Sequence, residues 1–230
     1  MKRVVLMALG IFLALIVASP VALGQVGHGA LASGKAGGLA ADWWQWALAE
    51  PVSDNPLVGG DPNYSEDQCD GQPLSEVPGK KWFLAGSFDG STVERTCTMP
   101  VGTQLFFPVG NVIYVNTDPT DTEQLARDYV NGFIDSMLAD PEFEIRVTVD
   151  GKQIKSKRIV RTDSPLFTVT LPENSLFSRF GVPAGEYDAV ADGLWAVLPP
   201  LSKGEHTIHF EISAPSLDFS QGNTYHLSVE

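Results

Sequence analysis

The chain has 230 residues, of which 43% are hydrophobic and 10% aromatic, and its formal net charge is −13. This apolar content is that of a folded protein and excludes an intrinsically disordered chain. The negative charge disfavours binding to nucleic acid or to an anionic membrane, because both would repel it. The length fits one ordinary domain, or one domain with a substantial insertion.

Residues 1–24 have the organisation of a secretory signal peptide. Lys2 and Arg3 precede an apolar run from Val4 to Val17, and small residues follow Pro20. The run is shorter than the ~20 residues that span a bilayer, which favours cleavage over an uncleaved anchor. We therefore expect a mature chain of residues 25–230, secreted to the periplasm or the extracellular space and free of the membrane. Loss of the two basic residues takes the net charge from −13 to −15.

The mature chain is expected to begin with a flexible stretch, residues 25–38, that is rich in Gly, Ala and Ser. A single domain, residues 39–230, follows it. The domain opens with a short Trp-rich helix, because Leu39, Trp43 and Trp46 fall at helical spacing.

The two cysteines, Cys69 and Cys97, are expected to pair. An oxidising compartment favours the bond, and two cysteines leave no ambiguity of connectivity. The bond would tether an irregular Pro- and Gly-rich loop, residues 52–80, to a strand and contribute about 3 kcal/mol. A catalytic cysteine is the alternative, but no His lies between His28 and His206 to activate it.

Short strands are predicted from Lys81 onward. Two continuous apolar runs, 82–85 and 105–107, predict central strands that are covered on both faces. Asp150-Gly151 predicts a type I′ hairpin that sets Val147 opposite Ile154. Other segments alternate apolar and polar residues, which predicts strands with one buried face; they run over 143–149, 167–171, 206–212 and 225–229. Together these strands predict a mainly β fold, an antiparallel immunoglobulin-like β-sandwich.

One long amphipathic helix, at about residues 120–138, interrupts the strands. Thr120 and Glu123 match a capping box, and Asp140-Pro141 ends the apolar stripe. Gly132 lies beside that stripe, and we expect it to let the helix approach a sheet closely.

Several strings, in this order along the chain, resemble a class of uncharacterised secreted bacterial β-sandwich proteins. The strings are 43–46 (WWQW), 82–86 (WFLAG), 95–97 (RTC), 106–108 (FFP), 164–167 (SPLF), 191–195 (ADGLW) and 204–208 (GEHTI). The resemblance extends over nearly all of the mature chain. It implies one secreted β-rich domain and supplies neither an activity nor a catalytic residue.

The candidate ligand-binding residues are aromatic side chains and one carboxylate. Trp43, Trp44 and Trp46 could stack on sugar rings if exposed, although packing in the core is the alternative that we favour. Asp192 and Trp195 would combine a hydroxyl acceptor with a stacking surface at a sheet margin. The alternative is a turn in which Asp192 bonds backbone N–H groups and Gly193 supplies an unusual φ.

Acidic residues suggest a calcium site without specifying one. The candidates are Asp118 and Asp121, before the long helix, and Asp61 and Asp67 in the irregular loop. Helix capping and the helix dipole explain the first group equally well, and no EF-hand loop is present. Apart from this possible Ca²⁺, the sequence implies no cofactor.

The sequence favours an exported, non-enzymatic module of the cell envelope or extracellular space. It would bind an unknown extracellular protein or glycan, since no phosphate loop, nucleophile elbow or paired Cys-x-x-Cys motif is present. One alternative is a secreted glycan hydrolase that uses loop carboxylates such as Asp192, with Glu186 and Asp188. The other is a self-associating scaffold subunit; the sequence leaves the oligomeric state open.

Overall fold

The computed structural model describes residues 5–7, 33–58 and 81–230. These residues form a mainly β protein with two α-helices, as expected. In chain order the elements are β1 (Val5–Met7), α1 (Ser33–Leu48), β2 (Lys81–Phe83), β3 (Val93–Met99), β4 (Gln104–Val115), α2 (Glu123–Leu138), β5 (Glu144–Val149), β6 (Lys152–Gln153), β7 (Ile159–Asp163), β8 (Phe167–Leu171), β9 (Gly185–Leu198), β10 (Gly204–Ala214) and β11 (Phe219–Val229).

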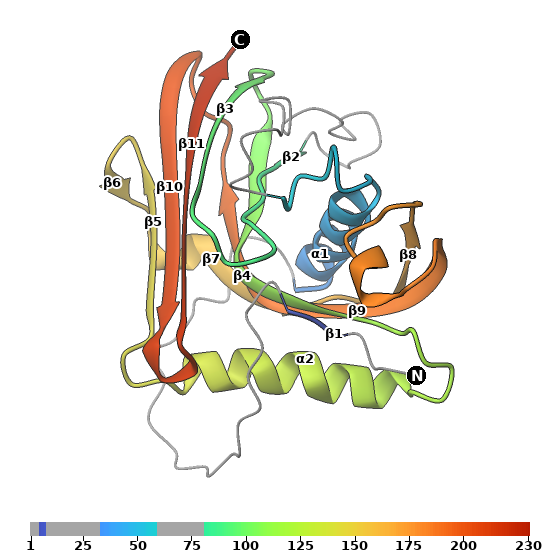
Figure 1. Ribbon diagram of the computed structural model, residues 1–230. Helices are drawn as coiled ribbons and strands as arrows, with labels where there is room; N and C mark the ends of the chain where they lie inside the picture. The colour runs from blue at the N-terminus through green and yellow to red at the C-terminus, as the bar shows by residue number, and fades with distance from the viewer. Residues whose placement is uncertain (1–4, 8–32, 59–80) are drawn as a thin grey trace.

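The strands form two sheets (Figure 1). Sheet A has the order β1-β4-β9-β7, with β2 also beside β4 and β8 also beside β9. Sheet B has the order β3-β11-β10-β5-β6. Two pairs, β2 with β4 and β3 with β11, are parallel. The expectation of a purely antiparallel fold is therefore wrong, and both sheets are mixed.

The core has two parts, one on each face of sheet A. Figure 1 shows α1 and α2 on opposite sides of β4 and β9. On the first face α1 packs against alternate residues of these strands, such as Ile113 and Trp195. On the second face the intervening residues, such as Val112 and Leu194, pack with α2 and the inner face of sheet B. Sheet A is thus covered on both sides, which explains the continuous apolar run in β4.

The two continuous apolar runs have different places in the sheet. Residues 105–107 lie in β4, which is bordered by β9 on one edge and by β2 on the other, as expected for an inner strand. Residues 82–85 were also expected in a central strand. The first two lie in β2, which pairs with no strand but β4 among the described residues, and the other two follow it; all four side chains are nevertheless buried. Burial on both faces therefore arises here without a second neighbour among the described strands.

The hairpin after β5 has the predicted form. Asp150 and Gly151 both have positive φ, 51° and 74°, as a type I′ turn requires. The Ile154 N–H donates to the Val147 carbonyl at 2.9 Å, which confirms the predicted register.

Helix α2 begins later than the proposed capping box. Thr122 is the N-cap, and its side chain accepts a hydrogen bond from the Leu125 N–H. Thr120 instead donates its N–H and hydroxyl to the Asp118 carboxylate. Gly132 was expected at a close helix–sheet contact, but a Cβ built there meets nothing within 4 Å. That expectation is wrong because Gly132 lies off the buried stripe, which is formed by Ala126, Val130, Ile134 and Met137.

Helix α1 begins earlier than expected. It starts at Ser33, so residues 33–38, which were assigned to a flexible N-terminal stretch, are helical. Ala36 is 2% exposed and packs in the first core. Small residues in this turn therefore allow close packing and do not mark a flexible segment.

Candidate functional site

A cavity of about 190 Å³ lies where the N-terminus of α2 meets the ends of β4 and β9. Helix α2, β4 and β9 all contribute to its wall. The two strands meet there because their antiparallel pairing brings Val115 opposite Ala189. The turn that leads into β8 adds Leu166, which is 46% exposed. The lining residues are Tyr114, Asn116, Asp121, Glu123, Ala126, Leu166, Asp188, Ala189 and Val190.

Hydrogen bonds fix the strand end and the helix start around this cavity. The Asn116 N–H donates to the Asp188 carbonyl at 2.8 Å, and the Asn116 side-chain amide donates to the Asp121 carbonyl at 3.1 Å. The Tyr114 hydroxyl donates to the Asp121 carboxylate. Among the described residues, nothing donates to the buried Asn116 Oδ1. The wall therefore offers a polar acceptor besides its carboxylates.

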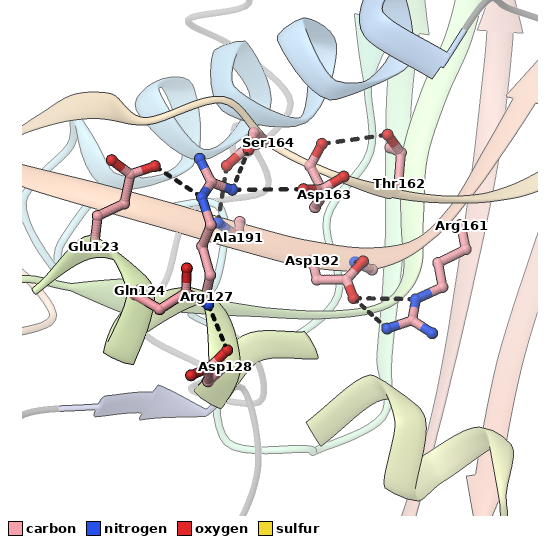
Figure 2. A network of polar contacts seen from close by, with 11 residues as sticks. Glu123, Gln124, Arg127, Asp128, Arg161, Thr162, Asp163, Ser164, Ala191 and Asp192 are labelled. Carbon is pink, nitrogen blue, oxygen red and sulfur yellow. Dashed lines mark hydrogen bonds and ion pairs between the residues drawn. The ribbon is translucent and has the colours of Figure 1, made fainter. Parts of the chain in front are cut away.

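The cavity lining is strongly acidic. Asp121, Glu123 and Asp188 contribute three carboxylates, and no Lys or Arg is among the described lining residues. Glu123 lies in the first turn of α2, where the helix dipole favours an anion. The adjacent Arg127 bonds Glu123 at 2.8 Å and the Ser164 carbonyl at 2.9 Å (Figure 2). Asp188 comes from β9 and is exposed, so its charge is available to a cation.

The predicted site residue Asp192 lies in a different network. Asp192 is 1% exposed, in the middle of β9, and its carboxylate accepts from the Arg161 guanidinium at 2.7 and 3.1 Å. Figure 2 shows this paired contact. Arg161 also bonds Asp135 and the Asn131 carbonyl, both on α2. The network therefore fastens α2 to β7 and β9.

The protonation of this pair follows from burial and from charge. Burial raises the pKa of the Asp192 carboxyl, and the Arg161 guanidinium opposes that rise. Burial would lower the pKa of Arg161, but hydrogen bonds to Asp192 and Asp135 outweigh it, and the pKa is raised. Arg161 thus stays charged and supplies the compensation that a buried carboxylate needs.

Asp192 and Trp195 do not form a joint site. They are three residues apart on one strand and therefore point to opposite faces of sheet A. Trp195 stacks on Phe106 at a centroid distance of 5.0 Å, on the α1 side. Gly193 does not have an unusual φ; its added Cβ would lie 2.7 Å from the Asn111 Cβ. The sheet-margin site and the turn are both wrong, because the segment is an inner strand. The bond expected between Asp192 and a nearby backbone N–H is present, since the Gly193 N–H donates to the Asp192 carboxylate at 2.7 Å.

The tryptophans of α1 belong to the core. Trp43, Trp44 and Trp46 are 1, 0 and 8% exposed. Trp43 donates its indole N–H to the Leu84 carbonyl at 3.0 Å and makes an edge contact with Trp195. The core interpretation is confirmed, and these indoles present no surface on which a ligand could stack.

Two of the four calcium candidates, Asp118 and Asp121, lie within the residues that the structure describes. Asp118 accepts from Thr120, and Asp121 accepts from Tyr114. Within the described ranges, no three His, Cys, Asp or Glu side chains gather as a metal site would need. Asp61 and Asp67 lie outside the described residues, so calcium binding stays a prediction.

Cys97 is buried in β3, at 4% exposed. Its predicted partner, Cys69, lies outside the described residues. The disulfide therefore stays a prediction.

Two residues of the cavity are candidates on the sequence alone, but the sequence does not place them together. Asp121 was considered for calcium and Asp188 for hydrolysis, on separate grounds, and Tyr114 was not singled out. A polar run that follows a long apolar strand marks the Asn116–Asp121 side. Nothing in the sequence places Asp188 beside that run, because the pairing of β4 with β9 brings together residues about 70 positions apart.

Comparisons with known proteins give little further information. No family model and no curated protein matches the chain. One similar solved structure is PbICP-C in a complex with falcipain-2, with 10% identity, 66% of this chain and 100% of that chain covered, and a TM-score of 0.27. Amebosin is another, with 12% identity, 61% and 97% coverage, and a TM-score of 0.21. Scores this low carry no argument. In the described segments, no helix has the length and hydropathy to span a bilayer.

Proposed function

We propose that the chain is an exported, non-enzymatic module of the cell envelope or extracellular space that binds a cationic group of a partner. The signal-like segment 1–24 supports export, and the two facing sheets support an immunoglobulin-like sandwich. The observation that carries the binding role is the cavity with three carboxylates and no basic residue among its described lining.

The size of the cavity favours a side chain over a glycan. Its 190 Å³ is below the ~300–1,000 Å³ of sites that enclose drug-sized ligands. A guanidinium or ammonium group on an aliphatic stem fits the mixture of carboxylates with Leu166, Ala189 and Val190. The proposed partner is therefore a protein that presents Arg or Lys. The acidic mature chain would also attract such a partner at long range.

The hydrolase alternative loses its leading residue in this geometry. Its leading residue, Asp192, is buried and held by Arg161. Glycoside hydrolysis needs two carboxylates that flank the scissile bond in an accessible site. The carboxylates of the cavity, at 190 Å³, line a space too small for a glycan chain, so we favour cation binding.

Binding of a positive charge can be tested with two matched ligands. N-acetyl-arginine amide carries the charge, and N-acetyl-citrulline amide has nearly the same shape without it. We expect mature protein, titrated by calorimetry or NMR, to bind the first more tightly, with an affinity that falls as salt is added. Equal affinities for the two ligands would contradict the proposal.

Two variants locate the binding. Asp188→Asn should weaken arginine-amide binding about fivefold, because an exposed ion pair contributes up to ~1 kcal/mol. Asp128→Asn removes the same charge from an exposed position of α2 outside the cavity, and it should change affinity by less than about twofold. Equal losses of affinity in both variants would indicate a general effect of the negative charge, and would contradict binding in this cavity.

A further inference from the structure

The edge of β4 that faces away from β9 is shared by two short strands. Strand β2 covers Gln104 to Phe106 in parallel register. Strand β1 covers Val112 to Tyr114 in antiparallel register, with Leu6 opposite Ile113. Among the described residues, no strand other than β1 pairs with this edge at 112–114. The backbone groups that point to this side of β4 therefore have β1 as their strand neighbour, while the others point to β9.

Strand β1 lies within residues 1–24. If this segment is removed on export, as the proposed function includes, residues 112–114 become an open sheet edge. Unpaired N–H and C=O groups at an edge are a template for another strand. The inference therefore rests on cleavage of residues 1–24, but it does not depend on the acidic cavity.

This edge lacks the features that usually block strand addition. Such features are a charged side chain, a proline or a bulge. Pro108 and the bulge of β4 lie upstream, between Pro108 and Gly110. Val112, Ile113 and Tyr114 carry no charge and are 0, 0 and 3% exposed.

An added strand would continue both apolar layers of the protein. Val112 and Tyr114 belong to the core shared with α2, and Ile113 belongs to the core shared with α1. A strand beside them would contact apolar surface on both faces of the sheet. Its successive side chains point to opposite faces, so all of them should be apolar. The sequence of β1, Val-Leu-Met, has this composition.

We propose that the β4 edge at Val112–Tyr114 of the mature chain binds an extended apolar segment of a partner protein, antiparallel to β4, in the position of β1. The open stretch is only three register positions long. A short extended segment can use such a stretch by β-strand addition, whereas a whole second copy would gain little contact from it. The partner is therefore expected to present an uncharged, apolar strand.

The test begins with export of the full precursor into an oxidising compartment. The mass of the purified product establishes whether it begins at Gln25. A labelled peptide that copies residues 4–8, with a lysine tail for solubility, is then titrated by fluorescence anisotropy. Its matched control carries Leu6→Pro, which removes a backbone N–H and disfavours pairing. Placing the change in the peptide avoids any effect on folding of the protein.

We expect saturable binding of the first peptide and at least tenfold weaker binding of the proline peptide. Hydrogen exchange at 112–114 should slow only with the first. A cleaved protein that binds neither peptide, or both equally, would overturn this inference while leaving the cation site intact. A dimer that must dissociate before the peptide binds would overturn it in favour of self-pairing. A product that still carries residues 5–7 would overturn it together with the proposed export.

Discussion

Arg161 holds two carboxylates from different elements, Asp192 of β9 and Asp135 of α2. Its replacement should be costly because Asp192 is almost fully buried. We expect Arg161→Met to lower the free energy of unfolding by about 3 kcal/mol at neutral pH, measured with urea. The loss should shrink in acid, since burial already favours the neutral form of Asp192.

An exposed pair supplies the control for Arg161. The Arg146 guanidinium lies 3.6 Å from Glu211, and its side chain is 60% exposed. Arg146→Met should therefore change stability by less than ~1 kcal/mol. Similar losses in the two variants would show that the Arg161 contacts have no special role in attaching α2.

His206 gives stability a defined dependence on pH. Its imidazole bonds Asp150 at 2.8 Å, which raises the pKa of His206 above its ordinary 6.5. The Thr207 N–H and then His206 lower the pKa of Asp150 below its ordinary 3.8. The His206 contribution is therefore present below about pH 6.5 and lost as pH rises through the raised pKa. The Asp150 contribution is present above about pH 3.8 and lost as pH falls through the lowered pKa.

Unfolding of His206→Gln across this range tests the pair. The stability difference from the unaltered protein should be largest between about pH 4 and 6.5, and it should diminish by pH 8. The partly buried His209 bonds Thr224 and Glu211 instead of Asp150; its Gln variant is the matched control. A difference that is constant from pH 5 to 8 would exclude the charged pair as its cause.

At the scale of elements, glycines in α2 and β9 should respond oppositely to alanine. A Cβ at Gly132 meets nothing within 4 Å, so Gly132→Ala should raise the unfolding free energy by about 0.5–1 kcal/mol through helix propensity. At Gly193 the Cβ would lie 2.9 Å from the Gly110 carbonyl oxygen. Gly193→Ala should therefore destabilise the protein in the same thermal or urea measurement. Stabilisation by both substitutions would contradict this account of β9.

The sequence predicts the boundaries of helices and strands best where local chemistry determines them. The Asp150-Gly151 turn was predicted with its register, because only a few residue types adopt two successive positive φ values. The N-cap of α2 was misplaced by two residues, from Thr120 to Thr122. Both threonines can cap a helix, and the choice depended on the contact of Thr120 with Asp118.

For the whole molecule, the sequence indicated a mainly β domain but not the polarity of its strands. Strand β3 runs parallel to β11, with Val93 opposite Asn223. The two-residue period is the same in parallel and antiparallel strands, since it reports only which side chains are buried. The pairing of strands 130 positions apart in the sequence leaves no local signal in either one.

The acidic cavity belongs to the same class of long-range features. Asp121 and Asp188 are both visible as charged residues, but their shared wall arises from the pairing of β4 with β9. Equally, Asp192 resembles a turn residue in the string Ala-Asp-Gly, and only its place in an inner strand explains its burial. Its partner, Arg161, lies 31 residues away.

By itself the sequence determined the strand-rich composition, the two helices, the hairpin turn and the burial of the tryptophans in α1. These depend on periodicity and on local backbone preference, which each segment carries within itself. Only the tertiary structure decided the mixed sheets, the buried Arg161–Asp192 pair, the acidic cavity and the strand that covers the β4 edge. Those features depend on contacts between distant segments. Such contacts contribute to the free energy of folding only once the sheets have formed.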